Sequence, residues 1–510
     1  MGRDGGGAQY NRPMPSIFSG AFTPAQVREF DRVAIERHGI AAYELMFRAA
    51  RATFEVACRR FPSARRWLVI CGAGNNAGDG YVIARLALAA GIDVNVATVM
   101  PPAPLTGAAG EAERDFAAAG GRSGQFTAEL LGDVPLVIDA MLGTGVARPL
   151  DGPWRHAVEA VNASECAVVA VDLPSGLDGA TGSVLGAAVC ADVTVTYIAL
   201  KTGLFLAEGP DHAGDVELAT LDVPPEILAE ALPRFRRFEP AEQQALLPRR
   251  PRAAHKGDFG HVLVIGGNHG LAGAARLCGE AALRAGAGLV SVATRPEHAA
   301  ALVAARPELM CRGVASGSEI EPLLARASVV AVGPGLGQDD WARSLFLRAL
   351  ESHKPLVLDA DALNLLAAAP VRRDDWVLTP HPGEAGRLLG QATRDVQRER
   401  LQALDALIER YGGVVLLKGR GTLVGVRGAI PWVIDAGNPG MATGGMGDVL
   451  TGLIAGILAQ TEPPRRPAAT ACAAWIHAAA ADAAVRHGGE RGLIAGDLFA
   501  ELRPWLNPSS

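Results

Sequence analysis

The amino-acid sequence predicts an α/β protein with two domains, each built on a parallel sheet covered by helices on both faces. Short apolar runs alternate with helix-length segments in both halves of the chain, which is typical of strands joined by crossover helices. This alternation gives way to Pro- and Arg-rich sequence over residues 226–250. A chain of 510 residues is also longer than one ordinary hydrophobic core supports.

Composition narrows the classes of function. The formal net charge of −6 gives no long-range attraction for polyanions, so we expect neither nucleic acid nor a membrane surface as a partner. The seven cysteines include no Cys-x-x-Cys pair, which fits a reduced compartment better than a disulfide framework. Residues 1–20 lack the apolar core of a signal peptide, and no uninterrupted apolar run is long enough to span a bilayer. We therefore expect a cytoplasmic protein, and the sequence leaves open whether it forms homo-oligomers.

The N-terminal half begins with helices and continues as a strand–helix series. After a flexible extension over residues 1–20, Thr23 and Pro24 mark a helix start, since Thr caps the first turn and Pro fits its first position. Helical segments are expected within residues 27–56 and at 78–90 and 154–161, and strands at 67–71, 94–99, 136–138, 167–171 and 193–197. We assign residues 1–225 to this first domain and 226–250 to a linker.

The C-terminal half shows the same alternation without an internal sequence repeat. Strands are expected at residues 261–265, 288–293, 329–332, 356–358, 376–378 and 414–417, and an apolar helix at 450–458. We assign residues 251–510 to this second domain. Ligands of open parallel sheets bind outside the carboxyl ends of the strands, so the segments that follow strands are the candidate sites.

A glycine-rich segment follows the first strand of the N-terminal domain. Residues 72–80 read Gly-Ala-Gly-Asn-Asn-Ala-Gly-Asp-Gly and lead into a helix, whose exposed N–H groups and dipole suit a phosphate. A dinucleotide fold of the dehydrogenase kind is the alternative, but it expects an acidic residue at the end of the next strand to hold the ribose. Residues 94–100 contain no such acid.

Two further strand ends carry carboxylates. Asp139 is followed by a glycine-containing loop at 143–149, and Asp172 opens the segment Asp-Leu-Pro-Ser-Gly-Leu-Asp, in which Ser175 supplies a hydroxyl. We expect these groups to meet in one crevice, where they can seat a hard monovalent cation or move a proton. The alternative for each residue taken alone is a turn or helix-cap role.

Together these segments resemble the NAD(P)H-hydrate epimerase family over roughly residues 20–225. The resemblance implies a potassium ion at Asn76, Asp139 and Ser175, proton transfer by Asp172, and a role for Lys201 near the substrate phosphate or the reacting ring. Hydrated NADH or NADPH is expected at Asp172 and at two runs of residues: Asn75, Asn76, Ala77, Gly78, Asp79 and Gly80, then Gly143, Thr144, Gly145, Val146, Ala147, Arg148 and Pro149.

Two residues depart from the pattern of that family. Ala77 stands where the family usually has glycine, which matters only if the position needs a positive φ. Phe47 stands where a glutamate is expected, so any contact from that carboxylate is lost. Both departures bear on the strength of substrate binding.

The clearest pattern of the C-terminal half precedes the helix at 450–458. Residues 440–448 read Gly-Met-Ala-Thr-Gly-Gly-Met-Gly-Asp; such a glycine run binds a transferring phosphoryl group, and Asp448 can take a proton from a substrate hydroxyl. A helix start with Asp448 as a cap is the alternative. Upstream, residues 418–422 read Lys-Gly-Arg-Gly-Thr and suit the phosphates and ribose of a nucleotide. Lys418 is one of four lysines among 48 basic residues, which points to a specific use of its compact ammonium.

These motifs resemble the NAD(P)H-hydrate dehydratase family, a branch of the ribokinase-like fold, over roughly residues 245–505. The resemblance implies hydrated-nucleotide contacts at Ala272, Gly335, His381 and Asp448. It places a second nucleotide, ADP with Mg²⁺, at Lys418, Gly419, Arg420, Gly421, Thr422 and Gly447. The expected architecture is a Rossmann-like three-layer α/β/α domain followed by a ribokinase-like α/β domain.

The two resemblances imply one repair function. The N-terminal domain would interconvert the R and S forms of hydrated NADH and NADPH, and the C-terminal domain would dehydrate the S form at the expense of ADP, giving AMP and phosphate. The alternative is a small-molecule kinase of the ribokinase-like superfamily with a non-catalytic N-terminal binding domain. The residues separate neither ADP from ATP nor the NADH hydrate from the NADPH hydrate.

Overall fold

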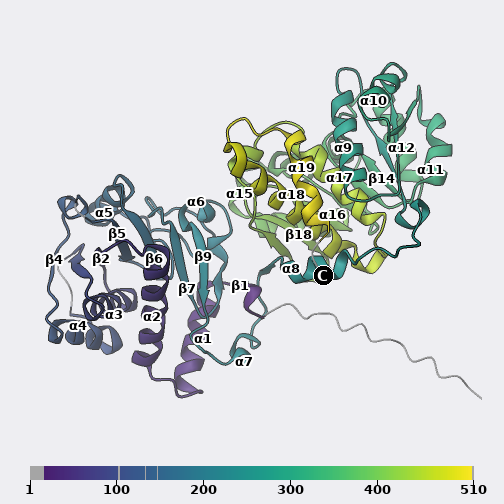
Figure 1. The fold of residues 1–510 in the computed structure, drawn as a ribbon. Helices are drawn as coiled ribbons and strands as arrows, with labels where there is room; N and C mark the ends of the chain where they lie inside the picture. Colours follow the sequence, from purple (N-terminus) through teal and green to yellow (C-terminus); the bar gives the residue numbers. More distant parts are fainter. Residues whose placement is uncertain (1–16, 101–103, 133, 146–147, 508–510) are drawn as a thin grey trace, which may run out of the picture. The chain divides into compact units, whose positions relative to one another are not determined.

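The computed structural model describes residues 17–100, 104–132, 134–145 and 148–507. These residues form two compact units that meet in sequence between Arg236 and Arg237, and each unit is described by itself (Figure 1). Most of the extension expected at 1–20 lies outside the described residues. The segment expected to be a linker, 226–250, contains regular structure: the end of α7 (Pro225–Leu228), β10 (Phe235–Arg237) and α8 (Pro240–Leu246).

The main sheet of the first unit is parallel throughout. Within the described residues its strand order is β4-β3-β2-β5-β6-β7-β9. The strands are β2 (Arg66–Cys71), β3 (Asp93–Thr98), β4 (Ser123–Gln125), β5 (Leu136–Ala140), β6 (Ala167–Val171), β7 (Val193–Tyr197) and β9 (Asp215–Ala219). Because β3 lies on one side of β2 and β5 lies on the other, the loops after β2 and β5 frame the crevice in which such sheets bind ligands.

Helices cover both faces of this sheet, as the sequence predicted. Along β2, Trp67 and Val69 pack on one side with α1 (Pro24–Glu36), α2 (Ala42–Arg60), α3 (Asn75–Ala89) and α4 (Gly107–Ala118). Leu68 and Ile70 point to the opposite side and pack with α5 (Gly152–Asn162). This alternation is the two-residue period of a strand with both faces buried, and it confirms the three-layer α/β/α architecture.

A smaller set of strands holds Lys201 in the first unit. Strand β1 (Gly20–Phe22) pairs in parallel with β8 (Leu200–Lys201) and antiparallel with β10. The short helix α6 (Gly209–Ala213) follows. Phe22, the partner of Lys201 in the register, is buried and packs edge-on against Phe30 of α1.

The second unit is built on a longer parallel sheet. Its strand order is β13-β12-β11-β14-β15-β16-β17, followed by the antiparallel strands β18 and β19. The strands are β11 (His261–Ile265), β12 (Leu289–Thr294), β13 (Met310–Gly313), β14 (Val329–Val332), β15 (Leu356–Leu358), β16 (Trp376–Leu378), β17 (Val414–Leu417), β18 (Thr422–Val426) and β19 (Trp432–Ile434). Every strand that the sequence predicted in this half is present.

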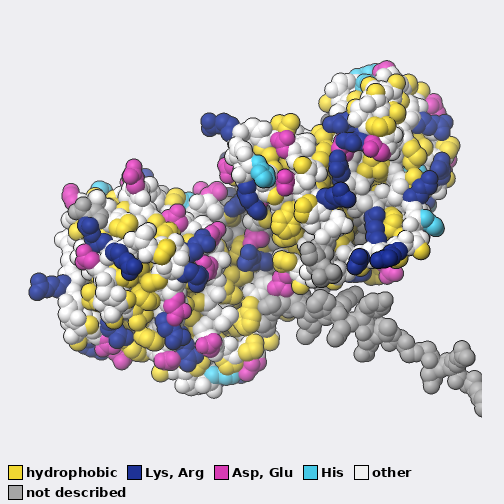
Figure 2. Space-filling model, in the orientation of Figure 1, with side chains coloured by type: hydrophobic (Ala, Val, Ile, Leu, Met, Phe, Trp, Pro, Cys, Tyr) yellow, Lys and Arg dark blue, Asp and Glu magenta, His cyan; other side chains and the backbone are white. Residues whose placement is uncertain are grey.

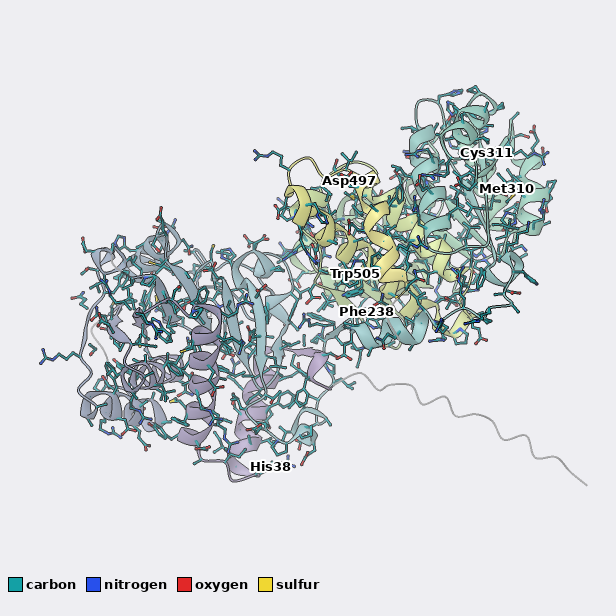
Figure 3. All side chains as sticks on the ribbon, in the orientation of Figure 1. His38, Phe238, Met310, Cys311, Asp497 and Trp505 are labelled. Atoms are coloured by element: carbon teal, nitrogen blue, oxygen red, sulfur yellow. The ribbon has the colours of Figure 1, made fainter. Side chains whose placement is uncertain are left out.

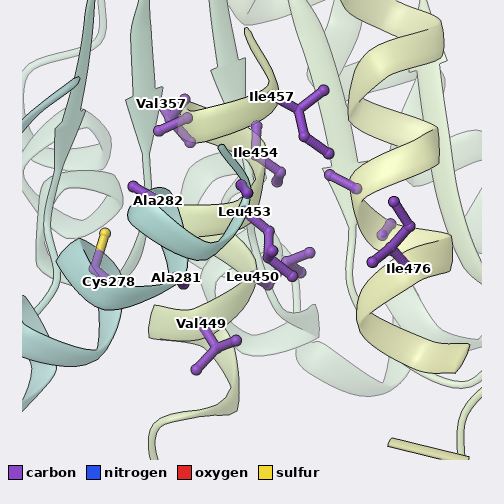
Figure 4. Packing of buried hydrophobic residues seen from close by; sticks show 14 of the residues in the cluster. Cys278, Ala281, Ala282, Val357, Val449, Leu450, Leu453, Ile454, Ile457 and Ile476 are labelled. Atoms are coloured by element: carbon purple, nitrogen blue, oxygen red, sulfur yellow. The ribbon is translucent and has the colours of Figure 1, made fainter. Parts of the chain in front are cut away.

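The helices of the second unit lie on both faces of its sheet. They are α9 (Ala272–Arg284), α10 (Ala299–Ala305), α11 (Glu321–Arg326), α12 (Asp340–Glu351), α13 (Ala360–Ala368), α14 (Pro382–Leu389), α15 (Thr393–Arg398), α16 (Arg400–Tyr411), α17 (Met446–Leu458), α18 (Arg466–Gly488) and α19 (Leu498–Leu506). One core cluster joins one face of β11, β12 and β14–β17 to α9, α17 and α18 (Figure 4).

Glycines let α9 and α17 pack very closely. A Cβ atom added to Gly452 would lie 2.1 Å from the carbonyl oxygen of Cys278, and one added to Gly456 would lie 2.6 Å from the Cβ of Ala285. Figure 4 shows Leu453 and Ile454 of α17 beside this contact. The close approach fixes the position of the amino end of α17 relative to the sheet.

Helix α18 is the most apolar long helix among the described residues. The segment Pro463–Gly488 contains an 18-residue window with a mean hydropathy of 1.3, so it could cross a membrane by length and composition. However, 67% of that window is buried inside the unit, where alanines and Ile476 belong to the core cluster. A buried core helix passes the same test.

Charged side chains of both signs are interspersed on the visible surface (Figure 2). Many of them form exposed pairs, such as Arg348 with Glu321 at 2.7 Å. Exposed pairs of this kind contribute little to stability.

Two helices that carry site residues begin earlier than the sequence predicted. Helix α3 begins at Asn75 instead of residue 78, and α17 begins at Met446 instead of residue 450. Each is preceded by a glycine with a positive φ, 89° at Gly74 and 94° at Gly445. These glycines turn the chain sharply, so the polar residues after them already belong to the first helical turn.

Candidate active sites

A cavity of about 970 Å³ opens at the carboxyl ends of β2, β5 and β6 in the first unit. Residues of α1, α2 and the loop before α4 complete its wall. The residues expected to bind substrate that line it are Asn75, Asn76, Asp79, Gly143, Thr144, Gly145, Arg148, Pro149 and Asp172, and Lys201 lines it with them. Val146 and Ala147 lie outside the described residues.

Three residues expected at the substrate do not line this cavity. Added Cβ atoms would lie 2.7 Å from Met46 at Gly78 and 2.7 Å from Ala140 at Gly80, so these glycines serve helix–helix and helix–sheet packing. Ala77 is fully buried in α3 and is absent from the residues with positive φ, so its methyl group is tolerated there. Phe47 packs against the core, with the guanidinium of Arg85 5.9 Å from the centre of its ring.

Asp172 and Lys201 form a tight pair in the cavity wall. The Lys201 ammonium donates to Asp172 Oδ1 at 2.5 Å and to the carbonyl oxygen of Tyr197 at 2.7 Å. Asp172 has a φ of 67°, a conformation that non-glycine residues rarely adopt, and the backbone N–H of Tyr197 donates to the same carboxylate oxygen at 3.2 Å. Since Lys201 is only 1% exposed, the pair lies in a low-dielectric environment that strengthens this charge-assisted hydrogen bond, and Asp172 lines the cavity.

Two further carboxyl groups face this pair. Burial raises the pKa of Asp79 well above its usual value, and the negative charges of Asp172 and Asp31 raise it further. Burial likewise raises the pKa of Asp31 to about 6. Sequence motifs do not identify Asp31; its only signal is its place on the apolar face of α1, next to the buried Phe30.

Asp139 and Ser175 form the hydrogen-bonded base of the loop at 143–145. The Ser175 hydroxyl lies 2.6 Å from Asp139 Oδ1, and the Ser175 N–H donates to Oδ2 at 2.8 Å. The N–H of Leu142 donates to the Ser175 hydroxyl at 2.9 Å. Burial raises the pKa of Asp139 to about 6, against these hydrogen bonds, which lower it. The side-chain Nδ2 of Asn76 is buried without a hydrogen-bond partner.

The second site lies at the carboxyl ends of the strands in the second unit, where Asp359 is the central residue. Asp359 is 2% exposed and follows β15 directly. Its Oδ1 accepts from the Lys418 ammonium at 2.7 Å, and its Oδ2 accepts from the Thr451 hydroxyl of α17 at 2.8 Å. A Cβ atom added to Gly447 would lie 3.5 Å from both Asp359 and Lys418, so the lysine reaches the glycine-rich start of α17.

Asp448 lies in the first turn of α17 beside this network. Burial raises its pKa to about 7, with a further contribution from Asp359, while Lys418 acts in the opposite direction. A carboxyl group that titrates near neutrality can take up and release a proton at physiological pH. The pKa of Lys418 is lowered by burial, but Asp359 and Glu384 outweigh that effect and raise it.

His381 caps α14 next to the same network. Its Nδ1 accepts from the backbone N–H of Gly383 at 3.0 Å, and Glu384 lies 3.8 Å from Lys418. Burial lowers the pKa of His381, and the nearby Lys418 lowers it further. The ring is therefore a neutral hydrogen-bonding group at pH 7.

The remaining predicted residues of the second site fall on neighbouring loops. Gly335 has a φ of 58°, and an added Cβ atom would lie 2.7 Å from the carbonyl oxygen of Leu271, directly before Ala272 at the start of α9. After β17, Gly419 and Gly421 have positive φ values and Thr422 donates to the carbonyl oxygen of Gly419 at 2.8 Å. Arg420 donates to the carbonyl oxygen of Gly437 at 2.6 Å. The geometry brings Lys418, Gly447 and Asp448 together, and it brings Ala272 next to Gly335.

Comparisons with known proteins agree with both halves of this description. Residues 42–203 match the family model described as the YjeF-related protein N-terminus, and residues 262–503 match that described as NAD(P)H-hydrate dehydratase. The chain is 47% identical over 485 residues to the bifunctional NAD(P)H-hydrate repair enzyme of Coxiella burnetii, covering 95% of this chain and 98% of that protein. It is 45% identical to the enzyme of the same name from Escherichia coli, covering 94% and 93%.

Solved structures resemble the second half. The ADP/ATP-dependent NAD(P)H-hydrate dehydratase from Bacillus subtilis, co-crystallised with ATP and Mg²⁺, has a TM-score of 0.48 and 28% identity, covering 53% of this chain and 96% of that one. The relatives that span both halves are named as repair enzymes, which favours the repair reading over a small-molecule kinase with a non-catalytic N-terminal domain. The chain belongs to the family of bifunctional NAD(P)H-hydrate repair enzymes.

Proposed function

We propose that this chain returns hydrated NADH and NADPH to the active coenzymes, with the first unit interconverting the R and S hydrates and the second unit dehydrating the S form with ADP. The observation that carries the proposal is the arrangement in the second unit. Asp448 stands at a glycine-rich helix start, beside a lysine that a buried carboxylate holds in place. A group that accepts a proton and groups that bind a phosphoryl oxygen thus lie together.

The dehydration follows from this arrangement in two steps. Asp448 takes the proton of the ring hydroxyl. The hydroxyl oxygen attacks the terminal phosphoryl group of ADP, and AMP leaves. Lys418 and the backbone N–H groups at the start of α17 stabilise the negative charge on the transferring group. Phosphate then leaves the ring carbon with its bonding electrons, a proton leaves the adjacent carbon, and the ring double bond is restored.

The epimerase site would convert the R hydrate to the S hydrate, so that the second unit can dehydrate material that began in either form. A dehydratase that accepts one hand leaves the other hydrate unrepaired. In the first unit the Asp172 carboxylate, held by Lys201, is placed to accept a proton from substrate in the cavity. Arg28 and Arg148 line the same cavity and supply positive charge for the phosphates of the nucleotide.

The residues around Asp139 fit a potassium ion. The site offers hard oxygen ligands: a buried carboxylate, a hydroxyl and backbone carbonyls. The amide of Asn76 has no partner at the position assigned to Nδ2, and a flip of the amide would place its oxygen there. Asn76, Asp139 and Ser175 would hold the ion, which would supply positive charge beside the substrate loop.

We expect KCl to raise the melting temperature of the first unit more than an equal concentration of choline chloride. An equal effect of the two salts would contradict the assignment.

The acidic groups of the second site fit a magnesium-bound nucleotide. Asp359, Glu384 and Asp448 provide three carboxyl groups near the one ammonium of Lys418. A magnesium ion bound with ADP would neutralise phosphate charge there.

Incubation of the purified chain with a mixture of both hydrates tests the proposed function. With ADP and Mg²⁺ we expect complete recovery of absorbance at the wavelength of the reduced coenzyme, together with stoichiometric AMP and phosphate. A parallel reaction with ATP shows which nucleotide is used. A stable phosphate ester as the product, without recovery of the coenzyme, would instead identify a small-molecule kinase.

A further inference from the structure

We propose that Asp31 is a second proton-transfer residue of the epimerase site, which works with the Asp172–Lys201 pair on the same substrate; this inference rests on the proposed function. Asp31 lies on α1, whereas Asp172 follows β6 and Lys201 ends β8. All three side chains line the one cavity of the first unit described above. The proposal therefore adds a proton carrier from an element that contributes no motif residue.

Asp31 lacks a hydrogen-bonding partner among the described residues. Among the described residues, the Asp31 carboxyl makes no hydrogen bond or ion pair, although it is partly buried. The exposed acids of the same helix are paired: Glu29 accepts from Arg32 at 2.6 Å, and Glu36 also pairs with Arg32. Partly buried polar groups without partners are uncommon, and one that lines a ligand cavity is a candidate for contact with the ligand.

The charge balance of the cavity also favours a proton-transfer role for Asp31. Two of the three N–H groups of the Lys201 ammonium donate to Asp172 and to a backbone carbonyl, and the ammonium forms its ion pair with Asp172 instead of Asp31. The other titratable groups that line the cavity are Arg28, Asp79, Arg148, Asp151, Asp172, Tyr197 and Lys201. Burial and the charge of Asp172 raise the pKa of Asp31 to about 6, while Lys201 lowers it. Asp31 can thus be present in both protonation states near neutral pH.

Two such groups suit the chemistry of epimerisation. To invert the hydrated carbon, Asp31 donates a proton to the hydroxyl, the carbon–oxygen bond breaks, and water leaves while the ring nitrogen supplies an electron pair to form a carbon–nitrogen double bond. A water molecule then adds to the other face of that carbon and gives its proton to Asp172. The atoms balance without an oxidant or a co-reactant, and the reverse reaction exchanges the two roles.

The test follows conversion of one pure hydrate by the full-length chain in the absence of ADP. We expect Asp31→Asn to slow the conversion by about 100- to 10,000-fold, toward the spontaneous background, and Asp31→Glu to recover part of the rate. Glu29→Gln on the exposed side of the same helix is the matched control and should retain the wild-type rate. Dehydration of the S hydrate with ADP should be unchanged in all three variants.

Two readouts separate proton transfer from a structural role. The wild-type pH profile should have a limb near pH 6 that is missing from the residual activity of Asp31→Asn. Because the raised pKa means that ionised Asp31 destabilises the fold above pH 6, Asp31→Asn should also leave the melting temperature of the first unit at pH 8 unchanged or raised. A structural role predicts the opposite, with the melting temperature and the rate falling together.

Isotope labelling tests the carbon–oxygen cleavage separately from the role of Asp31. In water labelled with ¹⁸O, each inversion should incorporate one solvent oxygen into the hydroxyl group. Wild-type conversion by Asp31→Asn with an unchanged pH profile would overturn the role of Asp31, and retention of the original oxygen would overturn the carbon–oxygen cleavage. If the wild-type chain itself did not interconvert the hydrates, the proposed function would fail, a result distinct from failure of the Asp31 variant alone.

Discussion

At the scale of single residues, each site gathers carboxyl groups around one buried lysine. Lys201 is bonded to Asp172, and Lys418 to Asp359, at 2.5 and 2.7 Å respectively. An ammonium is a compact point charge with three donors, so it fits a narrow space between a carboxylate and a carbonyl or phosphate better than the planar guanidinium of arginine. This explains why a chain so rich in arginine has lysines at these two positions.

Replacement of Asp448 separates the two activities. Asp448→Asn should preserve the start of α17, because Asn has nearly the same size as Asp and the N-cap of the helix is Gly445, with no side-chain cap hydrogen bond. Loss of the positioned base should reduce ADP-dependent AMP formation by about 100- to 10,000-fold. Interconversion of the hydrates, measured in the same preparation, should be unchanged. Wild-type AMP formation would show that Asp448 is not the base.

The pH dependence of dehydration should reflect the same carboxyl group. Asp448 must be ionised to accept a proton, and its pKa is raised to about 7, so we expect the rate to fall as the pH drops through 7. A raised pKa means that the folded state binds the proton more tightly than the unfolded chain, so stability is lost as the pH rises from about 4 through 7. Asp448→Asn should therefore melt at a higher temperature than the wild type at pH 8, with a difference that shrinks toward pH 4. The measurement is a series of melting curves, and a constant difference would contradict the assigned pKa shift.

Asp359 is expected to act as a positioning residue for Lys418. Hydrogen bonds to charged groups contribute about 1.5–3 kcal/mol, so Asp359→Asn should slow dehydration by about 10- to 100-fold. Because Asp359 raises the pKa of Asp448, the acidic limb of the rate profile should also move to lower pH. Thr451→Val removes the other hydrogen bond of Asp359 and is the matched control. In this variant the acidic limb of the rate profile should stay at the pH of the wild type. A limb that moves equally in both variants would show a general distortion of the site.

Sequence patterns identify some of these residues and not others, for physical reasons. Asp139, Asp172 and Asp448 follow apolar strands or glycine runs, so local sequence reveals their positions. Asp359 follows the predicted strand β15, but its role depends on contacts with Lys418 and Thr451 from distant segments, which local sequence does not reveal. Asp31 interrupts the apolar face of a helix, and only the packing of α1 beside the strand ends gives that position a function.

At the scale of elements, the central parallel strands could be predicted closely, whereas the edge strands β4, β9 and β13 and the helix starts could not. Parallel strands buried on both faces are continuous apolar runs, so β2, β11 and β14 lie within a residue of their expected bounds. The first turns of α3 and α17 are polar and glycine-rich because they face ligand sites, and such sequence resembles a loop. The short strands β1 and β10 depend on pairing between distant segments, which local sequence does not reveal.

The contact between α9 and α17 should be sensitive to the smallest added side chain. Gly452→Ala places a methyl group against the carbonyl oxygen of Cys278, 2.1 Å away, so the helices must separate. Overpacking of this kind costs about 1–3 kcal/mol, and the shift should lower dehydratase activity because Asp448 lies on the same helix. Gly488→Ala is the matched control, since an added Cβ atom there meets no atom within 4 Å. Melting curves and AMP formation check both variants; equal behaviour would show that the helix contact accommodates a methyl group.

At the scale of the whole molecule, each unit has its own sheet, core and candidate site. Residues 237–250, which the sequence assigned to a linker, contribute to the core of the second unit. The ring of Phe238 lies 5.9 Å from that of Trp475, which in turn lies 5.3 Å from that of Trp505. Figure 3 labels Phe238 and Trp505. Helix α8 follows, and the Gln243 amide donates to the carbonyl oxygen of Trp505. Proline- and arginine-rich composition indicated a linker here because a single short helix gives little periodic signal.

Division of the chain at two alternative points tests this boundary. A cut between Arg236 and Arg237 leaves Phe238 and α8 with the second unit, so we expect two soluble fragments: one that interconverts the hydrates without ADP and one that dehydrates the S hydrate with ADP. A cut after Arg250 removes the same residues from the second unit. Loss of a buried phenylalanine typically costs about 3–5 kcal/mol, so this second C-terminal fragment should melt at a lower temperature or aggregate. Melting temperatures and the two activities of both fragment pairs provide the measurement. Equal stability of the two C-terminal fragments would show that Phe238 and α8 are dispensable, and inactivity of all fragments beside an active full chain would show that the units depend on each other for function.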